Sequence, residues 1–104
     1  MVEGESHVIL EKFTEPLNKL GTNPFSLRVF NEDRSIEYYG PYSGQVDLDY
    51  IIIEGGSTTP YGIQRTDGSR ISSGQTVLVD YSHAENFSVR YRTNLILSTL
   101  QNMV

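Results

Sequence analysis

Two aspartates are the first residues of this chain that could do chemistry. Asp47 and Asp49 lie two residues apart, so on a β-strand their side chains would share one face. Such a pair could bind a cation or act as a general acid and base. A calcium loop needs further oxygen ligands nearby, however, and here Ile51 and Ile53 follow on the same face. We therefore expect two solvated carboxylates where a strand begins.

The histidines offer a weaker case for chemistry. His83 and Glu85 have the same spacing of two, and His7 is the only other imidazole. The chain contains no Cys, which excludes thiolate nucleophiles and cysteine-ligated metals. Ser82 and His83 are neighbours, so on a strand they would point to opposite faces and could not form a catalytic pair. We expect His83 to be a solvated loop residue and the chain to have no enzymatic activity, no metal and no cofactor.

The seven tyrosines favour binding over catalysis. Five of them, with one phenylalanine, could form an aromatic platform for a sugar or a protein partner: Phe25, Tyr38, Tyr39, Tyr42, Tyr50 and Tyr61. Tyr38, Tyr39 and Tyr42 are the best candidates for partner contact, because Gly40 and Pro41 predict an exposed, irregular loop around them. In a small all-β domain, however, half-exposed tyrosines more often seal the ends of a sheet.

Length and charge narrow the choice of partner. The 104 residues are enough for a single β-rich domain, residues 1–104, with one core. Thirteen acidic residues against eight basic ones give a net charge of −5, and the basic residues are scattered, so we expect no nucleic-acid binding. No apolar run approaches the ~18 residues of a transmembrane helix, and no basic region typical of a secretory signal is found at the start, so we expect no membrane contact.

Short apolar runs between turn-forming residues predict a mainly β fold, an antiparallel β-sandwich or a small barrel. Strands are expected at residues 25–29, 47–54, 76–81 and 87–91. Val77, Val79 and Tyr81 would share the core-facing side of one strand, which we expect to pair with residues 87–91 across the loop 82–86. Residues 47–54 have apolar side chains on both faces in their second half, which predicts a central strand.

Turn residues predict how some of these strands are connected. Asp67-Gly68 favours the positive φ angles of a type I′ turn, which predicts a hairpin between residues 63–66 and 69–72. Ser73-Gly74 and residues 31–34 predict further tight turns.

A short helical turn is expected near the N-terminus. Thr14 could cap it and Gly21 could close it, with Leu17 and Leu20 facing inward.

A second helix is expected at residues 95–104. Ile96, Leu100 and Met103 would form one apolar stripe along it. The segment has no closing Gly, and a helix of about ten residues is marginal alone in water. We therefore expect it to dock on a partner, either the rest of a longer subunit of which this chain is a fragment or a second copy in a homo-oligomer.

From residue 49 onward the sequence resembles a known family. The pattern I-x-x-G-x-x-V-x-V-x-Y-x-H-x-E-N-F-x-V-x-Y-x-x-N begins at Ile71 and ends at Asn94, before the predicted apolar helix. It follows the strand-like residues 49–52 and 63–66. This arrangement is similar to the β-rich insertion of baseplate J-like proteins of contractile-tailed bacteriophages and related injection machines, and the similarity covers residues 49–104.

The resemblance implies a structural role. It implies a domain within a longer wedge subunit of a phage tail baseplate, which is made in the host cytoplasm, is located in the virion and contacts other baseplate subunits. The family carries no catalytic residues to transfer. The second hypothesis is a β-sandwich module that binds a carbohydrate or a protein, for which the aromatic segment from Tyr38 to Tyr42 is the support.

Overall fold

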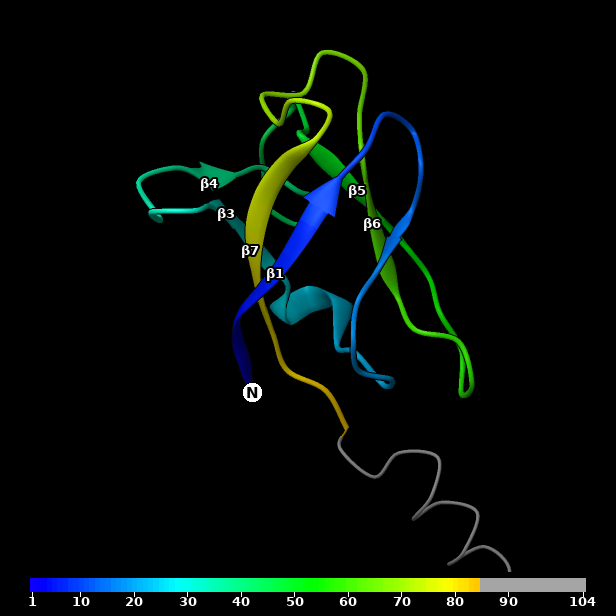
Figure 1. Ribbon diagram of the computed structural model, residues 1–104. Helices are drawn as coiled ribbons and strands as arrows, with labels where there is room; N and C mark the ends of the chain where they lie inside the picture. The colour runs from blue at the N-terminus through cyan, green and yellow to red at the C-terminus, as the bar shows by residue number, and fades with distance from the viewer. Residues whose placement is uncertain (85–104) are drawn as a thin grey trace, which may run out of the picture.

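The computed structural model describes residues 1–84, which form two antiparallel β-sheets (Figure 1). The first sheet has the strand order β1-β7-β3-β4 and the second has the order β2-β6-β5. In chain order the strands are β1 (Val2–Ile9), β2 (Glu15–Pro16), β3 (Arg28–Asn31), β4 (Glu37–Tyr38), β5 (Tyr50–Ile53), β6 (Gly62–Arg65) and β7 (Gln75–Tyr81). The mainly β prediction is confirmed, and within residues 1–84 the two sheets stay open and form no closed barrel.

Strand β7 organises the first sheet. It pairs with β1 along its whole length and with β3 over residues 77–80. Val77, Val79 and Tyr81 are completely buried on its inner face, as their alternation predicted. Because β1 and β3 occupy both edges of β7, no edge is left there for the predicted hairpin with residues 87–91, which lie outside the described residues.

Strand β6 is the centre of the second sheet. It pairs with β5 on one side and with the two residues of β2 on the other. The prediction that residues 47–54 form a central strand is therefore wrong, because β5 lies at the edge of the described sheet. Apolar side chains on both of its faces do not reflect burial on both faces, since Ile51 is 36% exposed.

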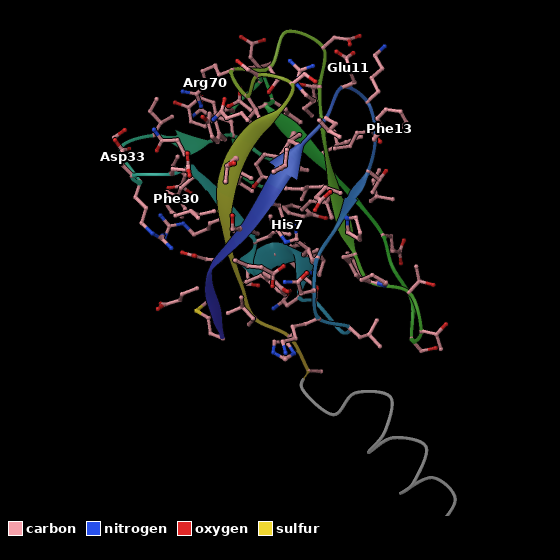
Figure 2. All side chains as sticks on the ribbon, viewed as in Figure 1. His7, Glu11, Phe13, Phe30, Asp33 and Arg70 are labelled. Atoms are coloured by element: carbon pink, nitrogen blue, oxygen red, sulfur yellow. The ribbon has the colours of Figure 1, made fainter. Side chains whose placement is uncertain are left out.

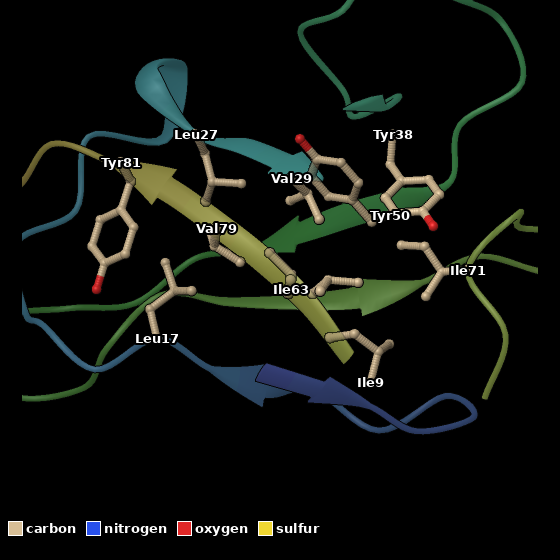
Figure 3. Packing of buried hydrophobic residues seen from close by; sticks show 11 residues of the cluster. Ile9, Leu17, Leu27, Val29, Tyr38, Tyr50, Ile63, Ile71, Val79 and Tyr81 are labelled. Carbon is tan, nitrogen blue, oxygen red and sulfur yellow. The ribbon is translucent and has the colours of Figure 1, made fainter. Parts of the chain in front are cut away.

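The core lies between the two sheets (Figure 3). Side chains from both sheets and from the connecting segments form one cluster, made of Ile9, Leu17, Leu27, Val29, Tyr38, Tyr50, Ile63, Ile71, Val77, Val79 and Tyr81. Burial of each large aliphatic side chain contributes about 1.5–3 kcal/mol. This cluster therefore holds the two sheets together.

The predicted N-terminal helical turn does not form. Glu15 and Pro16 pair instead with β6 as strand β2, and the N–H of Leu17 donates to the Tyr61 carbonyl at 2.9 Å. Pairing with β6 satisfies backbone groups that a single helical turn would leave unpaired. Leu17 still reaches the core, where it is 2% exposed.

The only helical segment within residues 1–84 is one 3₁₀ turn, η1 (Pro24–Ser26). It replaces the beginning of the strand predicted at residues 25–29. The Asn23 side chain caps it by accepting the Phe25 N–H at 3.1 Å, and Pro is well suited to the first position because it lacks an N–H. The predicted C-terminal helix, residues 95–104, lies outside the described residues.

Two of the predicted turns are confirmed and the third differs. Residues 31–34 join β3 to β4, and Ser73-Gly74 leads into β7. At Asp67-Gly68 only the glycine has a positive φ, of 75°, so the turn is not type I′. Residues 69–72 form no strand, because they turn toward Asp49 and bond to it instead.

Candidate binding surface

The three predicted contact tyrosines lie in different surroundings. Tyr38 is 4% exposed, belongs to the core and accepts a hydrogen bond from the Gln75 side chain. Tyr39 is 37% exposed, with the Arg70 guanidinium 4.4 Å from its ring centre. Tyr42 is 58% exposed. The structure therefore leaves Tyr42 as the aromatic side chain of this loop most open to a partner and assigns Tyr38 a packing role.

Phe25 joins Tyr42 at the surface. The two ring centres lie 4.6 Å apart with the planes tilted by 47°, although the residues come from distant segments. Phe25 is 72% exposed. Aromatic side chains with an exposed face are typical of binding surfaces for proteins and sugars. Of the predicted platform, the structure brings Phe25 and Tyr42 together.

Two neighbouring hollows surround this aromatic pair. The larger one, here called the edge groove, has a volume of about 360 Å³ and is lined by Pro24, Pro41, Tyr42, Ile51, Ile52, Glu54 and Tyr61. The smaller one, the inner hollow, has a volume of about 130 Å³ and is lined by residues of both sheets, including Arg28 of β3 and Tyr50 of β5. Pro41, Tyr42 and Ile52 border both. The surface is thus continuous around Tyr42.

The edge groove reaches across the open edge of β5. Ile51 and Ile52 are consecutive strand residues, so their side chains point to opposite faces of the sheet. Both nevertheless line the same groove. The groove therefore borders two consecutive residues of β5, the edge strand of its sheet.

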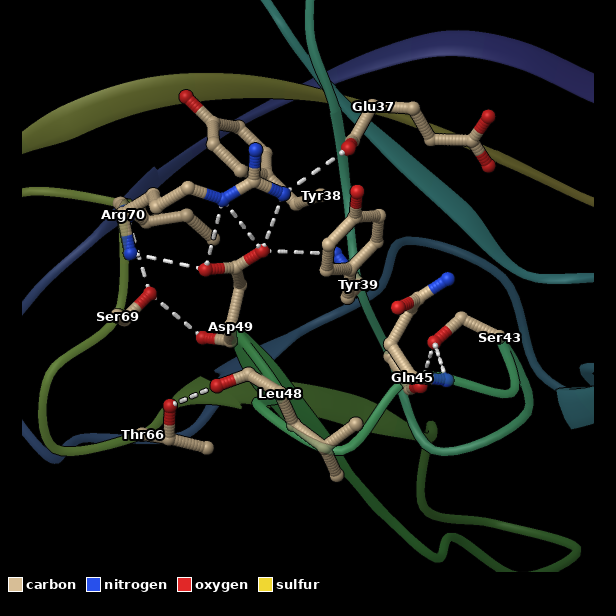
Figure 4. A network of polar contacts seen from close by, with 12 residues as sticks. Glu37, Tyr38, Tyr39, Ser43, Gln45, Leu48, Asp49, Thr66, Ser69 and Arg70 are labelled. Atoms are coloured by element: carbon tan, nitrogen blue, oxygen red, sulfur yellow. Dashed lines mark hydrogen bonds and ion pairs between the residues drawn. The ribbon is translucent and has the colours of Figure 1, made fainter.

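Asp49 holds the base of the loop that carries Tyr42 (Figure 4). Its carboxylate accepts the Tyr39 N–H at 2.8 Å and the Arg70 N–H at 2.9 Å, and the Arg70 guanidinium lies 2.6 Å from it. The Asp49 N–H in turn donates to the Tyr39 carbonyl at 2.7 Å. Residues 39 and 49, the two ends of the loop, are thereby fixed to each other.

The electrostatics of Asp49 match this structural role. Burial raises the pKa of the carboxyl, but hydrogen bonds from the Arg70 side chain and from the backbone N–H groups of Tyr39 and Arg70 outweigh burial, so the pKa lies below its usual range. The group is therefore charged at neutral pH. The prediction of a solvated carboxylate is wrong for Asp49, which is 3% exposed, and it holds for Asp47, which is exposed.

Gly40 lets the loop pack closely over β5. A Cβ atom at this position would lie 2.3 Å from the ring of Tyr50, which is itself buried. The close approach brings Pro41 and Tyr42 to the rim of the inner hollow. The predicted irregular loop is thus held at its base by Asp49 and against the sheet by Gly40.

A charged pair forms the polar side of the inner hollow. Arg28 of β3 donates to both oxygens of the Glu37 carboxylate on β4, at 2.9 and 2.7 Å. The side chain of Arg28 remains 58% exposed and that of Glu37 42% exposed. Both residues line the inner hollow beside the aromatic rings of Phe25 and Tyr42. This hollow therefore combines aromatic and polar groups.

His7, labelled in Figure 2, belongs to a buried polar cluster that the sequence did not predict. It is 5% exposed, its Nδ1 lies 2.7 Å from Glu15, and its Nε2 bonds to Glu5. Glu5 also accepts the Tyr81 hydroxyl at 2.6 Å. Since Glu5 and His7 belong to β1 and Glu15 belongs to β2, the cluster connects the two sheets. The alternation of Glu5, His7 and Ile9 on one strand face is the signal that could have found it.

The described residues offer no site for a metal ion. Within residues 1–84, no three His, Asp or Glu side chains converge so that they could hold one. In the His7 cluster the two carboxylates bind opposite nitrogens of the ring, so the groups share no common centre. The prediction that His83 is a solvated loop residue is wrong: it is half-buried, forms a β-bridge with Thr22, and its ring centre lies 6.3 Å from that of Tyr81. Glu85 and the predicted helix residues Ile96, Leu100 and Met103 lie outside the described residues.

Comparison with protein-family models, with curated proteins and with solved structures gives no significant match to this chain. The resemblance to baseplate J-like proteins therefore depends on the sequence of residues 49–104. Of these, the described part contributes β5 and β6 to one sheet and β7 to the other. In residues 1–84 no helix is long and apolar enough to span a membrane.

Proposed function

We propose that this chain is a structural domain of a tail-baseplate subunit of a contractile-tailed phage, and that it works by contacting other baseplate proteins. The observation that carries the proposal is the exposed aromatic and apolar surface around Phe25 and Tyr42. Protein interfaces are enriched in aromatic side chains at their centre, and a surface of this kind favours protein contact. The baseplate setting is supported by the sequence pattern that ends at Asn94.

The ionisable groups in the described residues support contact rather than catalysis. Asp49 is engaged by Arg70 and by two backbone N–H groups, and His7 is enclosed by two carboxylates. Both sets of groups join segments of the fold. In this proposal the domain is not an enzyme and forms one part of a longer subunit in the virion, with residues 95–104 as the junction or as a contact between two copies.

The proposal is tested by locating the chain in particles. Virions of the phage that encodes it would be purified, their tails separated, and tail proteins identified by mass spectrometry. We expect peptides of this sequence in the baseplate fraction, within a polypeptide longer than 104 residues. Absence of the sequence from purified virions would contradict the proposal.

A second candidate function is carbohydrate binding, favoured by the inner hollow. Its Arg28–Glu37 pair offers polar groups for sugar hydroxyls beside the exposed rings of Phe25 and Tyr42. A glycan array probed with the chain and with Tyr42→Ala distinguishes the two functions. Binding to one glycan class that is lost in the variant would favour the sugar-binding module.

A further inference from the structure

The edge of β5 is open along its second half. The N–H of Thr66 donates to the Asp49 carbonyl at 3.1 Å, so residues 49 and 66 form a hydrogen-bonded pair. Because hydrogen-bonded and non-hydrogen-bonded pairs alternate along an antiparallel ladder, the N–H and C=O groups of Ile51 and Ile53 point toward β6. The N–H and C=O of Ile52 therefore point to the opposite side. In the part of the chain that the structure describes, no strand lies on that side.

The other edge strands are protected in ways that β5 is not. β1 contains a register shift between Val2 and Glu5, and it directs the Glu5 carboxylate inward, where it bonds to the buried His7. β2 and β4 have two residues each, and β2 includes Pro16. Bulges, inward charges, proline and short length all discourage the addition of another strand. β5 has four residues and none of these features.

We propose that an extended, apolar peptide segment of a partner protein adds to the open edge of β5. Its backbone pairs with the N–H and C=O of Ile52, and one of its apolar side chains occupies the edge groove beside Tyr42 and Tyr61. This inference deepens the proposed function and depends on it, because it names the surface and the kind of partner through which the domain makes contact. Strand addition of this type gives affinity through the backbone and specificity through side-chain pockets.

The negative charge of the edge groove favours a partner segment that carries a basic residue. Glu54, at the end of β5, is the one charged side chain in the lining of the edge groove. The whole chain has a net charge of −5. A Lys or Arg on the partner segment opposite Glu54 therefore complements the site, whereas an acidic segment is repelled.

The lining favours a peptide over a sugar in the edge groove. Six of its seven lining residues are proline, tyrosine or isoleucine, and Glu54 is the sole acid. Sugar sites need several polar side chains aimed at hydroxyls, because an unpaired hydroxyl is costly to bury. An alternative occupant is a second copy of this chain that pairs β5 to β5, and light scattering in the experiment below distinguishes it.

The test is a selection of random seven-residue peptides displayed on particles against the immobilised 104-residue chain. We expect the enriched peptides to alternate apolar and polar residues and to include Lys or Arg. Ile52→Pro removes the outward N–H and should weaken binding about three- to tenfold, and Tyr42→Ala about tenfold. Glu54→Lys should reverse the preference toward acidic peptides. Phe13→Ala, at a 69% exposed residue outside the groove, is the matched control and should change nothing.

A second variant guards against misfolding of Ile52→Pro. Ile51→Lys places a charge on the open edge, which blocks strand addition. Because Ile51 is 36% exposed in the parent, the Lys side chain can reach solvent and the fold should be kept. Thermal unfolding checks each variant, and amide shifts of residues 51–54 on addition of a synthetic selected peptide report the site. Three results would each overturn the inference. The same peptides could be enriched equally on the parent and on Ile51→Lys, or a glycan could shift the amides of residues 51–54. The third is a dimer in light scattering that depends on β5. If the chain is found in baseplates but selects no peptide, only this inference fails.

Discussion

At the scale of single residues, Asp49 is the side chain on which the candidate surface most depends. It accepts three sets of hydrogen bonds while 3% exposed, and it joins the two ends of the loop that carries Tyr42. Asp49→Asn removes the charge that Arg70 pairs with and weakens the bonds to two backbone N–H groups. We expect the free energy of unfolding to fall by about 2 kcal/mol, measured by urea titration. Asp47→Asn, at an exposed position two residues away, is the control and should stay within about 0.5 kcal/mol of the parent.

Lowering the pH should destabilise the fold through the carboxyls of Asp49 and Glu5. Burial raises the pKa of Glu5, but hydrogen bonds from Tyr81, His7 and the Asn18 N–H outweigh it, so this pKa also lies below its ordinary value of 4.5. In the unfolded chain both carboxyls return to ordinary values, so the folded state binds fewer protons. Their stabilisation is therefore complete above about pH 5 and is lost as the pH falls through the lowered folded values.

The expected result is a steep loss of unfolding free energy between about pH 5 and pH 3. Glu5→Gln should make this part of the curve shallower, because one of the buried carboxyls with a lowered pKa is gone. Urea titrations at a series of pH values measure the slope. A parent chain whose stability does not change across this range would show that these carboxylates do not stabilise the fold.

At the scale of elements, β7 should be the strand least tolerant of change. Val79 is completely buried, and its strand pairs on both sides with β1 and β3. Val79→Asp would place a carboxylate without partners in the core, which costs several kcal/mol and is comparable with the whole stability of a small domain. We expect the variant to be unfolded by circular dichroism. The Thr76→Asp variant, changed on the outer face of the same strand, should have a melting temperature close to that of the parent. If Thr76→Asp unfolded the chain and Val79→Asp did not, the assignment of the two strand faces would be wrong.

Elements with a local signal could be predicted from sequence, and elements that depend on distant pairing could not. The alternation of Val77, Val79 and Tyr81 is local, and it identified both the strand and its buried face. The apolar run at residues 50–53 was local too, but whether a strand is central or at an edge is decided by its neighbours. Glu15 and Pro16 likewise became β2 only because β6 offered backbone partners.

The candidate site shows the same division between local and distant signals. Gly40 and Pro41 predicted the exposed loop, and Tyr42 is exposed there as expected. Tyr38, two residues before Gly40, looked equally available, yet it faces the core because β4 pairs with β3. The contact of Phe25 with Tyr42 and the Asp49–Arg70 pair each join segments far apart in the sequence, and no spacing rule places them together.

At the scale of the whole molecule, the described fold should not need the end of the chain. Among the described residues 1–84, the core cluster extends from Ile9 to Tyr81. We expect deletion of residues 98–104, which removes Leu100 and Met103, to leave the β-sheet circular dichroism and the melting temperature close to those of the parent. If the parent forms a dimer in light scattering, the deletion should abolish it. Unfolding of the truncated chain would show that these residues belong to the core.

The central claim is that the surface around Phe25 and Tyr42 is covered by another protein in the assembled baseplate. Hydroxyl-radical footprinting tests it most directly, by comparing side-chain oxidation in the isolated chain with that in purified tails. Phe25 and Tyr42 are 72% and 58% exposed, so both should be oxidised readily in the isolated chain. The account predicts strong protection of these two residues in tails, while Phe13, 69% exposed and outside the groove, serves as the reference. Oxidation of Phe25 and Tyr42 in tails at the same rate as in the isolated chain would contradict the claim.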